Sequence, residues 1–264
     1  MNQRPLVSVI MSEYNTDENL LKNSIKSIIN QSYNHLEVII IDDCGKNNLE
    51  QILSEFNDSR ISVIKNEKNM GLVYSLNRAL KYSKGKYIAR MDTDDFALEN
   101  RIKTQVDYME EHPDIDLISA NVEYYDGNEV WGKTKGQGEI TREKLLNGSP
   151  ITHPTIMAKR EVMNNVGGYP NYKRCEDYAM WIELYVNKYK MYKIPDILLR
   201  YHLSIDDYKK RTLKTRKDFF RLLNTQYKKL NPKKNAILKM KIKTLLAGIM
   251  PYRIMYSYHK RKAK

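Results

Sequence analysis

Two short apolar runs, separated by an amphipathic stretch, constrain the fold of this chain most strongly. The runs "LVSVIM" (6–11) and "LEVIIID" (36–42) are rich in β-branched residues, as is typical of strands buried on both faces of a parallel sheet. The segment between them has apolar residues at helical spacing, namely Leu20, Leu21, Ile25, Ile28 and Ile29. Because parallel strands need a crossover connection, residues 6–42 predict a strand–helix–strand unit.

The same alternation continues along the chain. A helix is expected near "LEQILSEF" (49–56), a strand at "ISVIKN" (61–66), a helix across "GLVYSLNRALKYS" (71–83) and a strand at "KYIARMD" (86–92). This order predicts an open, doubly wound, mostly parallel α/β sheet. Ligands of such sheets bind beyond the carboxyl ends of the strands, where this sequence has "SEYN", "DDCG" and "DTDD".

After residue 100 the alternation loosens. We expect a helix in "RIKTQVDYMEEHP", a strand in "DLISANVEYYD", a short helix at 176–187 and a strand ending in "LLRYH", followed by mainly helical structure from about residue 212. The predicted organisation is one domain over residues 1–208, with a nucleotide-binding half (1–100) and an acceptor-binding half (101–208). A helical tail at 209–264 follows.

Charge separates the tail from the body. Residues 209–264 contain 19 Lys and Arg against one acid, a charge of +18, and the total of +13 therefore leaves residues 1–208 at −5. A mildly acidic body argues against a nucleic-acid-binding core. In the tail, Ile237, Met240, Leu245 and Ile249 lie at roughly helical spacing among lysines. A basic amphipathic helix of this kind suits an anionic membrane surface; a solvated basic face packed on the domain, or RNA binding, are the alternatives.

The expected cellular compartment is inferred from three features that the sequence lacks. No charged leader with an apolar core opens the sequence, and the apolar run "LLAGIM" is too short to cross a bilayer. The cysteines, Cys44 and Cys175, match no metal or redox spacing, which suits a reducing compartment. We expect a cytoplasmic protein, peripheral on the inner face of the plasma membrane.

An acidic cluster follows the strand expected at 86–92. Asp92, Asp94 and Asp95 repel one another, so a fold retains them only with a compensating cation or with abundant water. Oxygen ligands at a strand end suit Mn²⁺ or Mg²⁺, which commonly share their shell with substrate phosphates. Arg90 either holds diphosphate oxygens beside such a metal or serves as a structural counter-ion.

Seven motifs together extend these inferences. "VSVIMSEYN", "EVIIIDD", "NMGLVYSLNRAL", "GKYIARMDTDDFALENRIKTQ", "HPTIM", "GGY" and "CEDYAMWIEL" stand in the order and spacing of family 2 glycosyltransferases with the GT-A fold. The resemblance covers about residues 5–205 and is strongest to bacterial enzymes that build surface polysaccharides. It implies a GT-A domain and transfer of a hexose or N-acetylhexosamine from a UDP-sugar.

The resemblance also implies roles on the nucleotide side. Tyr14 matches the tyrosine that stacks on uracil, with Ser12 and Glu13 lining the base, and Asp43 matches the acceptor of the uracil N3–H group. Without the resemblance, Tyr14 could equally cap the core, and Asp42 is expected to hold its loop.

The acidic motif maps onto the metal site of the family. Asp94 matches the direct metal ligand, and Asp92 lies nearer the ribose and a metal-bound water. Asp95 is expected to cap the following helix instead.

On the acceptor side, Asp177 matches the general base of an inverting transfer. Glu176 is expected to orient a donor-sugar hydroxyl, Trp181 to offer an apolar face to a sugar, and His153 to lie near the donor or acceptor. Taken alone, these residues would be read as a helix N-terminal acid, a core tryptophan and a turn histidine.

One motif departs from the family. His202 stands where the family has an arginine, and Ser204 where it has a histidine. The cluster Lys209–Arg211 either supplies the missing charge or begins the tail.

The sequence therefore predicts a metal-dependent inverting glycosyltransferase that forms a β-linkage to a lipid-linked, undecaprenyl-diphosphate type of acceptor. The alternatives are a nucleotidyltransferase, although "MSEYNTDEN" has no glycine-rich phosphate loop, and a non-enzymatic nucleotide- or RNA-binding module with a basic tail.

Overall fold

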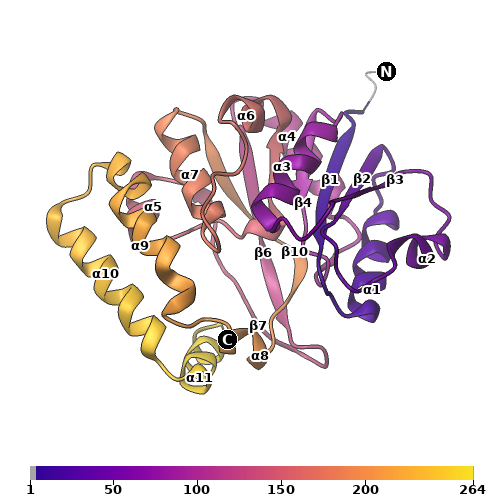
Figure 1. Cartoon of the computed structure of the whole chain (residues 1–264). Coiled ribbons are helices and arrows are strands. Elements are labelled where there is room, and N and C mark those ends of the chain that lie inside the picture. Colours follow the sequence, from indigo (N-terminus) through magenta and orange to yellow (C-terminus); the bar gives the residue numbers. More distant parts are fainter. Residues whose placement is uncertain (1–3, 264) are drawn as a thin grey trace.

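The computed structural model describes residues 4–263, and these residues form one central sheet with helices on both faces (Figure 1). Within that range the strand order is β3-β2-β1-β4-β9-β6-β10-β5, with β7 added to β6 and β8 to β10. The strands are β1 Val7–Glu13, β2 Leu36–Asp42, β3 Ile61–Lys65, β4 Tyr87–Arg90, β5 Phe96–Ala97, β6 Leu117–Tyr125, β7 Val130–Lys133, β8 Gly138–Glu139, β9 Met157–Lys159 and β10 Met191–His202.

Helices connect these strands and complete the chain. The α-helices are α1 Glu18–Ile29, α2 Leu49–Ser54, α3 Leu72–Tyr82, α4 Arg101–Glu111, α5 Arg142–Asn147, α6 Arg160–Asn165, α7 Glu176–Val186, α8 Ile205–Lys209, α9 Lys217–Asn224, α10 Lys234–Ile249 and α11 Tyr252–Lys262. Short 3₁₀ turns lie at His153–Thr155, Lys214–Arg216 and Gln226–Leu230.

The N-terminal half is the doubly wound parallel sheet that the sequence predicts. β1 pairs in parallel with both β2 and β4, and β2 pairs in parallel with β3. Successive residues of β1 enter opposite cores: Ile10 packs with α3, whereas Val9 and Met11 pack with α1. Burial on both faces explains the uninterrupted apolar runs.

The second half is a mixed sheet that brings distant residues to the acidic loop. β9 pairs antiparallel with both β4 and β6, and β10 runs parallel to β6. The two-residue strand β5 pairs antiparallel with β10 next to the acidic loop. The end of β10 therefore lies beside residues 92–95, more than 100 positions earlier in the chain.

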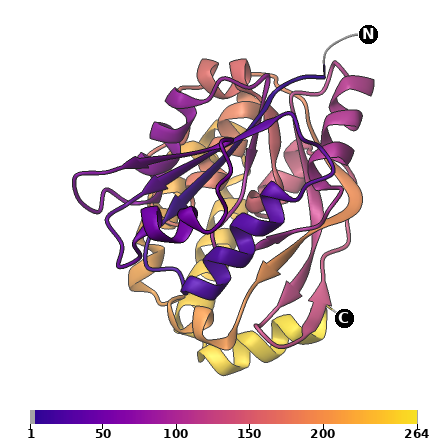
Figure 2. The ribbon, with the colours of Figure 1, turned by 90° about the vertical axis from the view of Figure 1, so that its right-hand side faces the viewer.

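The C-terminal segment is an integral part of the fold. The expected boundary between residues 208 and 209 falls inside α8. Leu222, Tyr227 and Met240 belong to the same core cluster as α7. At the far end, α11 packs on β6 and β7, and Lys133 N donates to the Ala263 carbonyl at 2.9 Å (Figure 2).

Helix α10 presents different residues to the protein and to solvent. Met240 and Ile237, expected on the membrane-facing side, pack against the core instead, so that part of the expectation is wrong. The exposed side carries a second apolar stripe, Leu238, Ile242, Leu245, Leu246 and Ile249. Among the helices of residues 4–263, none has the length and apolarity required to cross a membrane.

Candidate active site

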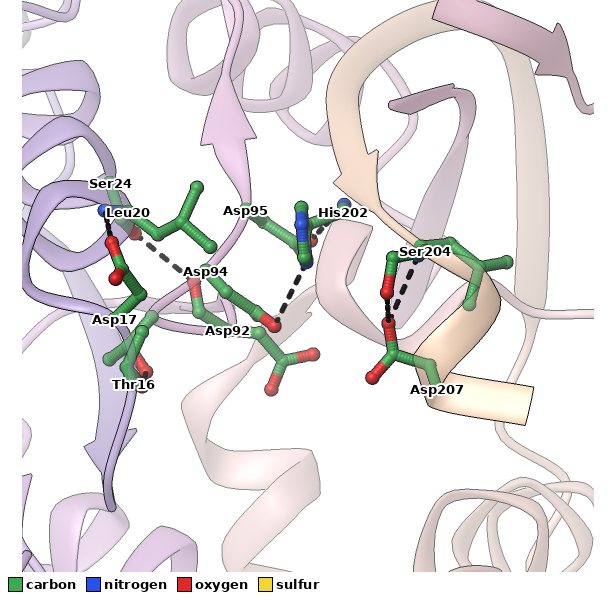
Figure 3. A network of polar contacts seen from close by, with 12 residues as sticks. Thr16, Asp17, Leu20, Ser24, Asp92, Asp94, Asp95, His202, Ser204 and Asp207 are labelled. Carbon is green, nitrogen blue, oxygen red and sulfur yellow. Dashed lines mark hydrogen bonds and ion pairs between the residues drawn. The ribbon is translucent and has the colours of Figure 1, made fainter. Parts of the chain in front are cut away.

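The acidic loop after β4 gathers three carboxylates at one point. Asp92, Asp94 and Asp95 each offer an oxygen, and these atoms lie within 4.8 Å of one another (Figure 3). The loop is tied to the end of β1, because the Thr93 hydroxyl lies 2.7 Å from that of Thr16. Such a set of hard oxygens fits Mn²⁺ or Mg²⁺. The side chain of Asp94 is 42% exposed, as direct coordination to a substrate-bridging metal requires.

Arg90 neutralises Asp92 from below the loop. The buried guanidinium donates to both oxygens of Asp92, one of them at 2.7 Å. Its fork is thereby occupied, which corresponds to the counter-ion alternative rather than to a residue free for diphosphate. Burial raises the pKa of Asp92, and Arg90 opposes that rise.

Asp95 does not cap a helix, so that expectation is wrong. The N-cap of α4 is Asn100. The buried Asp95 carboxylate instead accepts a 2.9 Å hydrogen bond from the backbone N–H of His202. Burial, with Asp94 and Asp92 nearby, raises its pKa well above the ordinary value. Asp95 therefore attaches the end of β10 to the acidic loop.

His202 and Ser204 have different roles at this junction. The Nδ1 atom of His202 lies 3.6 Å from an Asp94 oxygen, close enough for both to approach one ion. Ser204 forms a capping box with Asp207 at the start of α8, and its backbone N–H and its hydroxyl each donate to an Asp207 oxygen at 3.0 Å (Figure 3). Ser204 is thus committed to a helix cap, and His202 is the imidazole of this site.

The loop after β1 combines a fixed acid with an exposed aromatic ring. Buried Glu13 accepts from Thr16 N at 3.1 Å and from Asn47 Nδ2 at 2.8 Å, which holds the loop in place. Tyr14 is 50% exposed, so its ring is available to a ligand. Ser12, at the end of the strand, is half-buried. Stacking of uracil on Tyr14 stays a prediction, whereas the contacts of Glu13 give it a structural role in holding the loop.

The acidic pair Asp42 and Asp43, at the end of β2, is committed mainly to loop structure. Asp42 accepts from Cys44 N at 2.9 Å, as expected for a residue that holds its loop. Asp43 is buried and accepts from Asn66 Nδ2, Met70 N and Gly71 N. A carboxylate offers about four lone-pair sites, so a uracil N3–H would be a fourth donor to Asp43.

Two cavities meet at the end of β10. The larger, about 960 Å³, is lined by Asp92, Asp94, Glu176 and the start of α3. The smaller, about 350 Å³, is lined by His153, Asp177 and part of α11. Tyr201, Leu203 and Arg211 line both cavities.

The first turn of α7 divides its acids between these cavities. Glu176 lines the larger one and Asp177 the smaller. Burial, then the charge of Asp177, raises the pKa of Glu176 to about 7. Burial also raises the pKa of Asp177, which makes its carboxylate a stronger base.

Trp181 does not offer a face to a sugar, so that expectation is wrong. Its side chain is completely buried in the core below α7. It packs edge-on against His153, with ring centroids 5.8 Å apart, and therefore supports that residue from behind. His153 also lies 3.0 Å from the Tyr169 hydroxyl, and burial lowers its pKa well below the ordinary value.

Several cationic side chains that line the cavities were not identified from the sequence. Lys173 and Arg174 line the larger cavity and are separated from the acidic pair of α7 by Cys175 alone. Within the Lys209–Arg211 cluster, Lys209 pairs with Asp206, whereas Lys210 lines the larger cavity and pairs with Asp207. The only sequence signal for the first pair is its position near "ED".

Comparisons with known proteins agree on one family. Residues 8–167 match the family described as Glycosyl transferase family 2. An uncharacterized glycosyltransferase of Methanocaldococcus jannaschii is 34% identical over 233 residues, covering 85% of this chain and 80% of that protein. The UDP-Glc:alpha-D-GlcNAc-diphosphoundecaprenol beta-1,3-glucosyltransferase WfgD of Escherichia coli is 34% identical over 179 residues, covering 68% and 69%.

Solved structures share the fold at lower identity. TarS 1–349 of S. aureus in complex with UDP has a TM-score of 0.66 and 20% identity, covering 96% of this chain and 68% of that one. The mannosyltransferase PcManGT of Pyrobaculum calidifontis, in complex with GDP-Man and Mn²⁺, has a TM-score of 0.66 and 16% identity, covering 97% and 84%.

Proposed function

Since this chain belongs to glycosyl transferase family 2, we propose that it is a metal-dependent inverting enzyme of surface polysaccharide biosynthesis. It transfers a hexose or N-acetylhexosamine from a UDP-sugar to a lipid-linked saccharide and forms a β-linkage. UDP and GDP-mannose complexes of similar folds support a nucleotide-sugar donor, and the name of WfgD supports both UDP and a diphosphoundecaprenol-linked acceptor.

The observation that carries this proposal is the pair of adjoining cavities. The larger joins the acidic loop to Glu176, which suits a donor diphosphate and its sugar. The smaller contains Asp177, which suits an acceptor hydroxyl next to a base. A single displacement requires the attacking oxygen to lie about 3–3.5 Å from the anomeric carbon, which suits cavities that adjoin at shared lining residues.

The donor half would use groups from three strand ends. Tyr14 stacks on uracil, and Asp43 accepts its N3–H while it holds the 66–71 loop. Asp92 and Asp94 would hold Mn²⁺ or Mg²⁺, with Asp95 the third carboxylate of the cluster and His202 next to Asp94. The metal, when bound, stabilises the negative charge of the leaving diphosphate.

In the transfer itself, Asp177 accepts the proton of the attacking hydroxyl as that oxygen bonds to the anomeric carbon, and the bond from this carbon to the diphosphate oxygen breaks to release UDP. Neutral His153, fixed by Tyr169 and Trp181, limits the position of the acceptor. Glu176 accepts a hydrogen bond from a hydroxyl of the donor sugar when ionised, and donates one when protonated.

Nucleotide binding tests the donor half first. Titration with UDP, GDP, CDP and TDP, with and without Mn²⁺, should show selective UDP binding that requires the metal and is lost in Asp94→Ala. Substitution Asp177→Asn should leave UDP binding intact and reduce the transfer rate on the order of 10²-fold or more. If UDP bound equally well with and without Mn²⁺, the proposed metal site would be wrong. If Asp177→Asn were fully active, Asp177 would not be the base.

We also propose that α10 lies on an anionic bilayer, on the cytoplasmic side. The exposed stripe from Leu238 to Ile249 is flanked on the helix wheel by Lys241 on one side and by Lys239 and Lys243 on the other. Lysines beside an apolar face can extend to lipid headgroups, and each basic residue near such a surface contributes about 1 kcal/mol. The +18 charge of residues 209–264 gives the preference for anionic lipid.

Vesicle flotation separates this orientation from a solvated face. The double variant Leu245→Glu/Leu246→Glu should lose binding to anionic vesicles, and neutral vesicles should bind weakly throughout. Val63→Glu, an exposed apolar position on β3, is the matched control and should bind like the wild type. Equal flotation of the double variant and the control would exclude the α10 stripe as the contact.

The other candidate functions lack a supporting observation. A nucleotidyltransferase or a binding module gives no reason for an acid in each of two adjoining cavities. RNA binding predicts that RNA competes with anionic vesicles for the protein, which the same flotation assay can detect.

A further inference from the structure

The smaller cavity contains a cation without an acidic partner. Lys193, on β10, is 9% exposed, and within residues 4–263 its ammonium has one hydrogen-bond partner, the Thr152 hydroxyl at 3.3 Å. Burial of a charged ammonium is costly unless an anion compensates it. Among the described residues that line this cavity, Asp177 is the one acid, and it makes no ion pair with Lys193. The free-energy cost of burying this ammonium would be offset if a bound ligand supplied an anion.

A second cation lines the same cavity. Arg211 packs over the Tyr208 ring, 4.3 Å from its centroid, and in the described part of the chain it has no salt bridge. Its guanidinium therefore keeps its hydrogen-bonding fork available. Two such cations in a space of about 350 Å³ favour a group with several anionic oxygens, such as a phosphate ester.

Aromatic rings complete the wall beside these cations. Tyr124 lines the cavity and stacks on Trp131, and His259 of α11 closes the same side. Aromatic faces suit the apolar face of a sugar ring. A cavity volume above about 300 Å³ is typical of a small-molecule site.

We infer that the smaller cavity binds a saccharide phosphate, with the phosphate at Lys193 and Arg211 and a sugar hydroxyl at Asp177. This inference rests on the proposed function, because it takes Asp177 as the base, and it deepens that function: the attacked sugar would itself carry the phosphate. Recognition of the anion would then select acceptors that are still attached to their phosphate carrier.

Lys193 gives the cleaner test because it lines only the smaller cavity, whereas Arg211 lines both. The full chain, loaded with Mn²⁺ and UDP to fill the donor cavity, is titrated by calorimetry with N-acetylglucosamine 1-phosphate and with N-acetylglucosamine. The phosphate form should bind at least 10-fold more tightly, as expected for a charge-assisted hydrogen bond in a buried site. Lys193→Met should abolish that preference, and Lys193→Arg should retain most of it.

Controls separate this site from general charge effects and from misfolding. Lys144→Met removes an exposed charge that acts on Lys193 from outside the cavity, and it should keep the preference. Lys193→Met should melt no lower than the wild type, because methionine fills similar volume without a buried charge. Inorganic phosphate should bind more weakly than the sugar phosphate.

The outcomes also distinguish the two proposals. Failure of UDP to bind would refute the proposed donor site, yet the comparison of wild type with Lys193→Met would still decide the anion site. Three results would overturn the inference. N-acetylglucosamine 1-phosphate and N-acetylglucosamine could bind the wild type equally, or Lys193→Met could keep the full preference for the phosphate form. Inorganic phosphate could also bind as tightly as the sugar phosphate.

Discussion

Glu176 makes the stability of this protein depend on pH in a way that one substitution should remove. The residue is 6% exposed, and burial raises its pKa from 4.5 to about 7. A carboxyl whose pKa is raised by folding binds more protons in the folded state. Below about pH 4.5, Glu176 is protonated in both the folded and the unfolded state and does not change the free energy of unfolding. As the pH rises through about 7, ionisation of Glu176 lowers the free energy of unfolding by its full amount.

The magnitude follows from that difference in pKa. At 1.36 kcal/mol per pKa unit, the raised value corresponds to roughly 3 kcal/mol at pH 8. This is an upper limit, because Asp177 shares the effect. Replacement by glutamine removes the ionisation, so Glu176→Gln should be about 1–3 kcal/mol more stable than the wild type at pH 8 and nearly equal to it at pH 4.5.

Urea unfolding at several pH values, in metal-free buffer, measures this directly. The matched control is Glu161→Gln, an exposed acid in the first turn of α6, which repeats the loss of a carboxylate at a helix N-terminus. The control should give a difference of at most about 1 kcal/mol at pH 8, and of the opposite sign. A Glu176→Gln variant that is less stable than the wild type at pH 8, or a difference independent of pH, would refute the reasoning.

Three further perturbations test the structure around the site. Trp181→Ala should cost about 3–5 kcal/mol in urea unfolding because the ring fills the core, and a loss below 1 kcal/mol would contradict its burial. Arg90→Met should cost about 1–3 kcal/mol by leaving Asp92, which is 32% exposed, without its counter-ion, and Arg90→Met/Asp92→Asn should recover part of that loss; no recovery would contradict the pairing. Ser204→Ala should cost about 1 kcal/mol, whereas Ser204→Thr, which keeps the hydroxyl that donates to Asp207, should be nearly neutral.

Local periodicity was sufficient for most of the fold. The strands β1 and β2 and the helices α1 and α3 follow directly from apolar spacing, because both faces of a parallel sheet are buried. Periodicity could not decide which side of α10 faces the protein. Both sides are apolar, and only contact with α9 and the core separates Met240 from Leu245.

The candidate site was predictable where residues adjoin in sequence. The acidic loop and the pair at the start of α7 stand in short motifs, and strand ends bring them to one edge of the sheet. Trp181 was misread because burial depends on packing across elements, which no motif reports. Lys193 gave no signal, since an isolated lysine in a strand is ordinarily exposed and its enclosure depends on the loops that contain Gly136 and Thr152.

The wall formed by Tyr201, Leu203 and Arg211 has a consequence for how each substrate affects the binding of the other. These residues belong to both cavities, so any shift that a donor imposes on them also changes the surface that the acceptor meets. Affinity changes of this kind are reciprocal: if bound UDP-sugar strengthens acceptor binding, the acceptor must strengthen UDP-sugar binding by the same factor. Calorimetric titration of each substrate, with and without saturating amounts of the other, would then show each lowering the Kd of the other by the same factor.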